Sequence, residues 1–262
     1  MVLQTPCHTF RAMLQVQRDG PILRATIDRP DVRNAFNDEL IDALGRLFRE
    51  APTDVRAVVL TGEGSAFCAG GDLQWMRKAA SYSQAENEAD ALRLAGLFEA
   101  MVQCHALVIA RVNGAAFGGG CGLVAASDVA IAASGAKFAF SEVKLGLVPA
   151  TISPFVIPKI GPGHARALFA TGEVFDAAYA LRIGLIHKLG ELETLDALVD
   201  DTLRAVLAAG PKAVASAKQL AQTEMSPAQT AKLLAEARAG GEGKEGVAAF
   251  LEKRKASFVV ER

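Results

Sequence analysis

This sequence of 262 residues has few aromatic residues and no large excess of charge of either sign. Aromatics make up 6% of it, and 28 lysines and arginines nearly balance 29 aspartates and glutamates, which leaves a net charge of −1. Proteins that bind nucleic acid carry basic surfaces, so nucleic acid is not an expected partner. Because 51% of the residues are hydrophobic and only 22% are charged, intrinsic disorder is also excluded.

The sequence also lacks the spacings that metal sites and several familiar catalytic motifs require. Its four cysteines, Cys7, Cys68, Cys104 and Cys121, form no C-x-x-C pair, and its four histidines are scattered. We therefore expect reduced thiols, no disulfide and no bound metal. There is no G-x-x-x-x-G-K-[ST] phosphate loop and no G-x-S-x-G motif, and the G-P-G at 161–163 lacks the third glycine of a dinucleotide fingerprint.

No hydrophobic run is long enough to predict a membrane span. The most apolar region, residues 106–133, is interrupted by Arg111, Asn113, Asp128 and a group of glycines. A span of about 20 apolar residues does not accommodate charges so close to its centre. Residues 1–10 lack the basic start and apolar core of a secretory signal. We therefore expect a cytoplasmic protein with no membrane segment.

The hydrophobic periodicity predicts an α/β domain followed by a helical region. Alternating or buried apolar runs predict strands at 13–18, 22–28, 55–61, 107–112, 129–132 and 138–140, with Asp19-Gly20 as a hairpin turn. Helices are predicted over 38–50, capped by Asp38, and over 84–102. From residue 192 the pattern is helical, over 195–209, 211–222, 226–239 and 244–256. We therefore divide the chain into a core, 1–191, and a helical C-terminal region, 192–262.

Three segments carry residues suited to chemistry: 65–73, 113–122 and 140–149. The first two are glycine-rich turns that follow predicted strands, and two such turns could offer two backbone N–H groups to one oxyanion. The third holds Glu142 between apolar residues, where loss of water would raise its pKa toward a general acid–base range. The glycines could instead serve only close packing, with Glu142 on the surface, and both interpretations stay open here.

Taken together, the three segments resemble the crotonase (enoyl-CoA hydratase/isomerase) superfamily. The resemblance rests on A-F-x-A-G-x-D-L at 66–73, N-G-x-A-x-G-G-G at 113–120 and the glutamate followed by L-G-L-x-P, and it covers nearly the whole chain. It implies a crotonase-like ββα superhelix core with a C-terminal helical appendage. It also implies an acyl-CoA substrate, no separate cofactor because CoA arrives with the substrate, and a homotrimer or a dimer of trimers.

The resemblance also assigns roles to residues. The oxyanion donors of the family correspond to the N–H groups of Gly71 and Gly119, and its general acid–base corresponds to Glu142. The residues that correspond to its CoA site are Asp31, Val32, Arg33, Ala66, Ala69, Asp72 and Leu73. Phe250 and Lys253 correspond to positions that reach the adenosine 3′-phosphate, often in a neighbouring subunit.

One departure from the family pattern bears on the mechanism. Typical hydratases of the family use a second glutamate just after the glycine triplet, and that position is Gly122 here. Three functions remain open: hydration by Glu142 alone, double-bond isomerisation by Glu142, and CoA binding or scaffolding without turnover. Residues 29–38 and 141–156 are most similar to bacterial methylglutaconyl-CoA hydratases, which resemble this chain in having glycine at the Gly122 position.

Overall fold

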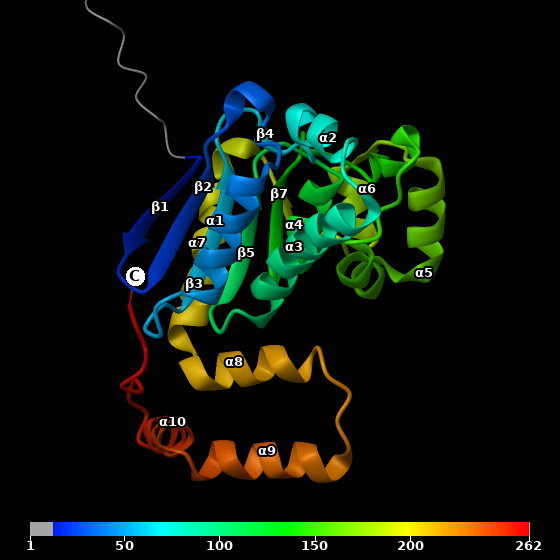
Figure 1. Ribbon diagram of the computed structural model, residues 1–262. Helices are drawn as coiled ribbons and strands as arrows, with labels where there is room; N and C mark the ends of the chain where they lie inside the picture. The colour runs from blue at the N-terminus through cyan, green and yellow to red at the C-terminus, as the bar shows by residue number, and fades with distance from the viewer. Residues whose placement is uncertain (1–12, 262) are drawn as a thin grey trace, which may run out of the picture.

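The computed structural model describes residues 13–261, and the chain is built on a six-stranded sheet (Figure 1). The strands follow the order β1 (Leu14–Asp19), β2 (Ile22–Ile27), β3 (Ala57–Gly62), β5 (Leu107–Val112), β7 (Val129–Ala133) and β10 (Lys188–Gly190). Within this sheet, β1 and β2 pair antiparallel, through a turn in which Gly20 has a φ of +57°, and the other neighbouring strands pair parallel. The predicted hairpin and strands are confirmed, with ends shifted by two residues at most.

A second, smaller sheet brings together the ends of the glycine-rich segments. Its order is β4 (Ala66–Cys68), β6 (Ala115–Phe117), β8 (Lys137–Ala139) and β9 (Phe175–Asp176). A Cβ atom on Gly114 would lie 2.0 Å from the Ser65 carbonyl oxygen, and one on Gly120 would lie 2.2 Å from that of Cys68. Any side chain there would push the two segments apart, so these glycines allow their backbones to pack in contact.

Helices α1 (Asp38–Arg49), α3 (Gln84–Gln103) and α4 (Gly119–Ala126) contribute to the larger hydrophobic core on one face of the main sheet. The prediction that Asp38 caps α1 is wrong. Asn37, in an extended conformation, accepts the N–H of Leu40 at 2.9 Å, whereas Asp38 is already helical and pairs with Lys78. Asparagine and aspartate are both good caps, and the backbone conformation selects the former.

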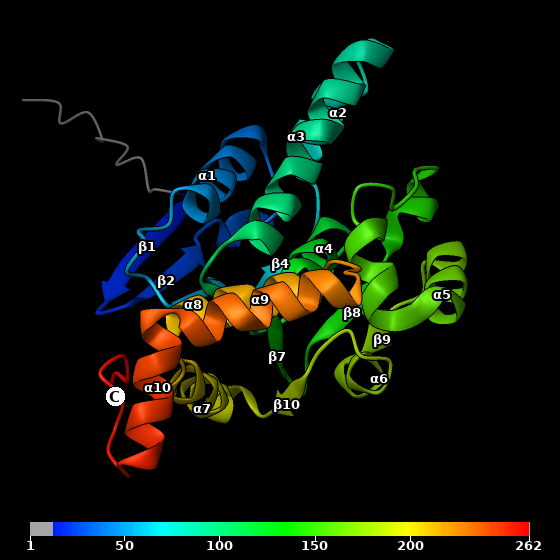
Figure 2. The same cartoon turned by 90° about the horizontal axis from the view of Figure 1, so that it is seen from below.

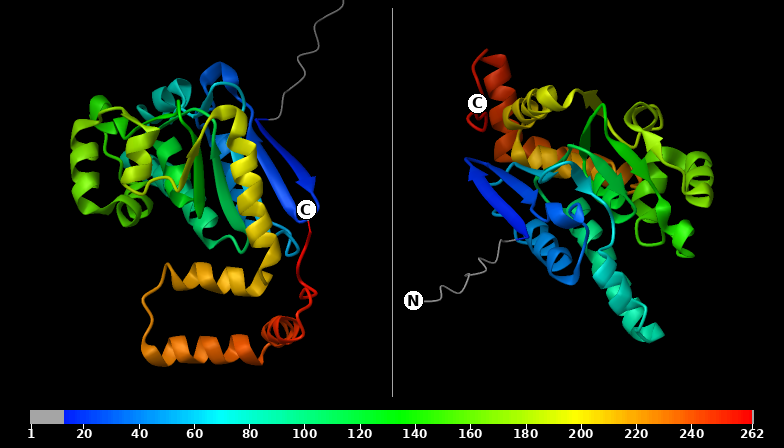
Figure 3. Two further views of the ribbon diagram at one scale, coloured as in Figure 1. Left: turned by 180° about the vertical axis from the view of Figure 1, so that it is seen from behind. Right: turned by 90° about the horizontal axis from the view of Figure 1, so that it is seen from above.

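The opposite face of the sheet is covered by α7 (Leu195–Ala208), as the view from behind shows (Figure 3). Leu195, Val199 and Leu203 form a second core cluster with strand residues that include Val59 and Ile109. The first long helix of the predicted C-terminal region therefore packs directly on the core. The division after residue 191 stays a prediction about domain organisation.

Helices α8 (Pro211–Leu220), α9 (Pro227–Ala239) and α10 (Gly241–Leu251) form a separate layer beyond one end of the sheet (Figures 1 and 2). Two cations with largely buried side chains join this layer to the core. Arg56 donates to the carbonyls of Val206, Ala209 and Phe258, and Lys218 donates to Asp128. The predicted helix over 244–256 is wrong at both ends: α10 begins at Gly241 and stops before Lys253, whose φ of +55° leaves the helical region.

The remaining helices are α2 (Leu73–Ala79), α5 (Ser153–Thr171), α6 (Ala177–Arg182) and three 3₁₀ segments, η1 (Pro30–Val32), η2 (Ser141–Leu145) and η3 (Leu192–Thr194). The G-P-G at 161–163 forms a kink in α5, where Gly161 has a φ of +74°. Across residues 13–261, no helix is both long and apolar enough to cross a membrane. Cys68, Cys104 and Cys121 are buried free thiols, and Cys7 and the segment 1–10 lie outside the described residues.

Candidate active site

Two glycines, Gly71 and Gly119, lie next to Phe36. Gly71 follows β4 and forms a bridge with Phe36, which donates its N–H to Gly70 at 2.7 Å. Gly119 is the first residue of α4, and a Cβ atom on it would lie 2.7 Å from Phe36 Cε2. Within residues 13–261, neither glycine N–H has a hydrogen-bond acceptor. The two predicted oxyanion donors therefore both lie next to Phe36, Gly71 along its backbone and Gly119 against its ring, with their N–H groups free to bind a ligand.

The Glu142 carboxylate lies against the beginning of α4. β8 pairs with β6, Gly118 donates its N–H to Ala139 at 2.9 Å, and η2 then carries Glu142 back toward Gly118. A Cβ atom on Gly118 would lie only 3.2 Å from Glu142 Oε1. Gly118 has a φ of +51°, so both its backbone conformation and the nearby carboxylate favour glycine there.

Burial changes the acid–base behaviour of Glu142. Its Oε2 atom is shielded from solvent and has no hydrogen-bond partner among the described residues. Loss of water penalises the charged carboxylate and raises the pKa of Glu142 above its ordinary value. The raised pKa agrees with the shift expected from the apolar residues on either side of Glu142 in the sequence. The group can therefore exchange a proton more readily near neutral pH than an exposed glutamate can.

The position expected for a second carboxylate has no room for a side chain. A Cβ atom on Gly122 would lie 2.5 Å from Ile152 Cγ2 and 2.7 Å from Phe98 Cζ. Both Ile152 and Phe98 are fully buried. The space next to Gly122 is therefore apolar and filled, and the Glu142 carboxylate lies beside Gly118 at the start of α4.

A cavity of about 640 Å³ leads away from Gly71 between η1 and the beginning of α2. The predicted CoA-site residues that line it are Asp31, Val32, Arg33, Ala69, Asp72 and Leu73. Arg29 and Arg77 also line the cavity, so it offers cations of the kind that bind phosphate groups. Ala66 does not line it: this residue is buried in β4, and its carbonyl accepts the Asn34 amide at 2.7 Å.

Asn34, for which the sequence predicted no role at the site, fixes the loop that forms this cavity. It is fully buried, has a φ of +58°, and donates to the carbonyls of Glu63 and Ala66 while accepting the N–H of Arg29. Arg33 beside it also has a positive φ, of 54°. Asparagine tolerates this left-handed conformation better than other residues with side chains, and that preference is the signal that could have identified it.

The Asp72 carboxylate is occupied within the protein. It caps α2 by accepting the N–H of Gln74 at 2.7 Å, and it pairs with Arg29 at 2.7 Å. Burial alone would raise the pKa of Asp72, but the hydrogen bonds from Gln74 and Arg29 hold it below its ordinary value. Asp72 therefore supports the wall of the cavity as a charged carboxylate.

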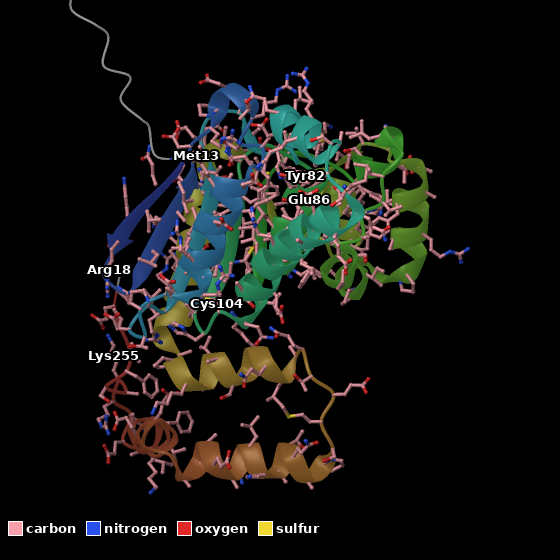
Figure 4. All side chains as sticks on the ribbon, viewed as in Figure 1. Met13, Arg18, Tyr82, Glu86, Cys104 and Lys255 are labelled. Carbon is pink, nitrogen blue, oxygen red and sulfur yellow. The ribbon has the colours of Figure 1, made fainter. Side chains whose placement is uncertain are left out.

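Phe250 and Lys253 do not join the cavity within one chain. They belong to the segment around the end of α10, beyond the far end of the sheet from η1 and α2 (Figure 1). Figure 4 gives the same separation, with Tyr82 and Glu86 near α2 and Lys255 beside α10. Phe250 is 82% exposed. Their expected contribution to a neighbouring subunit's site stays a prediction.

Comparison with known proteins identifies the family to which the chain belongs. The family model for enoyl-CoA hydratase/isomerase matches residues 17–260. A crotonyl-CoA hydratase from Syntrophomonas wolfei is 36% identical over 243 residues, which cover 89% of this chain and 92% of that protein.

Two solved structures extend the comparison to the fold. The structure of an enoyl-CoA hydratase from Mycobacterium smegmatis superposes with a TM-score of 0.90 at 33% identity, over 95% of this chain and 100% of the other. That of AtuE from Pseudomonas aeruginosa gives a TM-score of 0.89 at 36% identity with the same coverage. The crotonase fold expected from the sequence is confirmed, and the chain belongs to the enoyl-CoA hydratase/isomerase family.

Proposed function

We propose that this protein hydrates an α,β-unsaturated acyl-CoA thioester with Glu142 as its single general acid–base. The observation that carries the proposal is the position of the Glu142 carboxylate, whose Oε1 atom lies beside the Gly118 backbone at the start of α4. The thioester oxygen would accept the N–H groups of Gly71 and Gly119, and CoA would extend into the cavity between η1 and α2.

The chemistry follows from these three groups. Water attacks C3 of the enoyl group, and the electrons of the double bond move toward the thioester, whose oxygen gains the negative charge of an enolate. The two glycine N–H groups stabilise this charge where it develops. Glu142 takes the proton from the attacking water, and the carboxylic acid formed then gives a proton to C2. The product is a 3-hydroxyacyl-CoA, and Glu142 returns to its charged form.

A single carboxylate also suits a second reaction, double-bond isomerisation. Glu142 would remove a proton from C2 of a 3-enoyl thioester and return it to C4, with the same enolate held by the same N–H groups. The apolar surroundings of Gly122, formed by Phe98 and Ile152, favour this alternative because they offer no second group to bind water.

For the acyl group, we favour a methylglutaconyl-like chain. Support comes from the similarity of residues 29–38 and 141–156 to bacterial methylglutaconyl-CoA hydratases, together with the glycine at position 122. A carboxylate on the substrate itself could help to orient the attacking water in the absence of a second protein carboxylate. We further propose a cytoplasmic homotrimer or dimer of trimers. The exposed apolar residues Val247, Phe250 and Leu251 of α10 are suited to a subunit contact.

The test is a substrate panel. Crotonyl-CoA and 3-methylglutaconyl-CoA are supplied and loss of the enoyl-thioester absorbance is followed, while a 3-enoyl-CoA is supplied separately and followed for gain of that absorbance. We expect hydration, with a higher kcat/KM for 3-methylglutaconyl-CoA. Turnover of the 3-enoyl-CoA alone would favour the isomerase. Binding of all three thioesters with no turnover would reject both and leave a CoA-binding or scaffold protein.

A further inference from the structure

The single tryptophan of the sequence lies against one of the two proposed oxyanion donors. Atoms Cζ3 and Cε3 of Trp75 lie 3.2 and 3.3 Å from the position that a Cβ atom on Gly71 would occupy. Met76 Cγ lies 3.4 Å from the same point. The first turn of α2 therefore packs where a side chain of residue 71 would project, and its contact with the glycine is close.

A carboxylate on another helix holds the indole ring. Trp75 Nε1 donates to Asp90 Oδ1 of α3 at 3.4 Å. Burial raises the pKa of Asp90, and the charged groups that face it are Asp38 from α1, Lys78 from α2 and Arg93 from its own helix. Trp75 is half-buried and packs against the main hydrophobic core. Trp75 thus links the core to the N-terminal half of α3, which carries Asp90.

Few other contacts hold α2 in place. None of its seven residues is fully buried, and Leu73 is 69% exposed. Its ion pair, Lys78 with Asp38 at 2.8 Å, is largely exposed, and such pairs contribute little to stability. Figures 2 and 3 show α2 and the N-terminal half of α3 projecting from the body of the molecule. Besides Asp72, which caps α2 and pairs with Arg29, the Trp75 contact therefore joins α2 to the site.

The Gly71 N–H belongs to the peptide whose carbonyl, that of Gly70, accepts the Phe36 N–H at 2.7 Å, so its direction depends on how this segment is held between Phe36 and Trp75. Catalytic groups must be held within about 0.5 Å of their productive position by packing and supporting hydrogen bonds. We propose that Trp75, held by Asp90, is a positioning residue that keeps the Gly71 N–H aimed at the thioester oxygen. This inference rests on the proposed function, because it concerns the same oxyanion.

The kinetic test uses Trp75→Phe and Asp90→Asn, with Glu88→Gln on the exposed side of α3 as a control of matched charge change. A misdirected donor weakens the transition state more than the bound substrate, so we expect kcat on crotonyl-CoA to fall about tenfold with KM changed less than about twofold. Glu88→Gln keeps the wild-type values. Wild-type kcat in both Trp75→Phe and Asp90→Asn would overturn the proposal, and circular dichroism checks that each variant is folded.

A spectroscopic test uses the tryptophan itself. Titration with butyryl-CoA, a saturated thioester, should change the emission of the wild-type protein, whereas CoA without an acyl group should change it far less. Asp90→Asn should alter the emission of the free protein and reduce its response to butyryl-CoA. An emission indifferent to butyryl-CoA at saturation, measured by a separate binding assay, would overturn the proposal.

The two tests separate this inference from the function on which it rests. If the wild-type protein turns over no enoyl-CoA, the proposed function fails. The emission response to butyryl-CoA and its reduction in Asp90→Asn would then still decide whether Trp75 responds to thioester binding at Gly71. If turnover is normal in both Trp75→Phe and Asp90→Asn, the positioning role fails while the hydratase proposal stands.

Discussion

Phe98 Cζ lies 2.7 Å from the point where a Cβ atom on Gly122 would be, so the aromatic ring fills the space into which a side chain there would project. Phe98 also packs edge to face on Phe36, at 6.5 Å between ring centroids. Phe36 in turn contacts both proposed donors, Gly71 and Gly119. The absence of a second carboxylate is thus built into the packing of the core, and a single substitution at 122 would not supply one.

The packing of Phe98 and Ile152 against Gly122 predicts that a side chain at position 122 lowers the free energy of unfolding. Gly122→Ala should lower the free energy of unfolding by about 1–3 kcal/mol, because overpacking forces buried neighbours to shift. The matched control is Gly96→Ala on α3, where a Cβ atom meets nothing within 4 Å. That change should stabilise the protein by about 0.5–1 kcal/mol through helix propensity. Urea unfolding measures both, and equal effects would contradict the description of the site.

A second prediction concerns Asn34, which fixes the wall of the CoA cavity. Asn34→Ala removes three hydrogen bonds from a buried position and should lower the free energy of unfolding by about 2–4 kcal/mol. Asn34→Gly loses the same bonds but keeps the left-handed conformation, so it should be less damaging by about 1 kcal/mol.

Both Asn34 variants should also bind CoA more weakly, because η1 lines the cavity. Calorimetric titration with CoA measures this effect at a temperature where each variant is folded. Wild-type affinity in both variants would show that the cavity does not depend on the Asn34 hydrogen bonds.

A third prediction concerns the attachment of α8. Lys218 donates to Asp128 and to the carbonyls of Cys104 and Ala106, each at 2.7 Å, and its side chain is 8% exposed. Lys218→Met leaves the largely buried Asp128 carboxylate with only the Val108 N–H and without its ion-pair partner, and should cost about 3–5 kcal/mol.

Lys212→Met, on the exposed part of the same helix, is the control and should cost little. Adding Asp128→Asn to Lys218→Met should restore part of the lost stability, since the unpaired charge is then absent. Urea unfolding and hydrogen exchange over 211–220 provide the measurements. Equal unfolding curves for Lys218→Met and Lys212→Met would contradict a role for Lys218 in holding the helical layer.

A fourth prediction follows from the raised pKa of Glu142. A carboxyl whose pKa is higher in the folded than in the unfolded protein destabilises the fold as the pH rises from its ordinary pKa through its raised one. Glu142→Gln has no carboxyl at this position, so this loss of stability with rising pH does not occur in the variant. The free energy of unfolding of Glu142→Gln minus that of the wild type should therefore be larger at pH 8 than at pH 4. A difference independent of pH, or one of opposite sign, would contradict the buried, partnerless Oε2.

The sequence predicted best the features that depend on local pattern. The hairpin at Gly20 and the strands β1, β2, β3, β5, β7 and β8 follow from apolar runs and turn residues, whereas the assignment of Gly71 and Gly119 as oxyanion donors comes from the family resemblance. The cap of α1 was misassigned because Asn37 and Asp38 are both good caps, and only the backbone conformation decides between them.

Other features depend on contacts between distant parts of the chain. β10 and β4 are three residues long, too short for a periodic signal, and they form because the neighbouring strands are already present. The fit of Phe98 and Ile152 against Gly122 joins α3, α4 and the residue that precedes α5, which no local pattern describes. The same is true of Trp75 against Gly71, because an apolar residue on a short helix gives no indication of its partner.

The measurement that tests the central claim most directly compares wild-type and Glu142→Gln proteins on crotonyl-CoA, with butyryl-CoA binding measured in parallel. Glutamine keeps the shape of the side chain but cannot exchange the proton, so kcat should fall by at least about 10²-fold. The affinity for butyryl-CoA should stay within about twofold of wild type, because the N–H donors and the CoA cavity are intact. A Glu142→Gln protein that hydrates crotonyl-CoA at the wild-type rate would contradict the account.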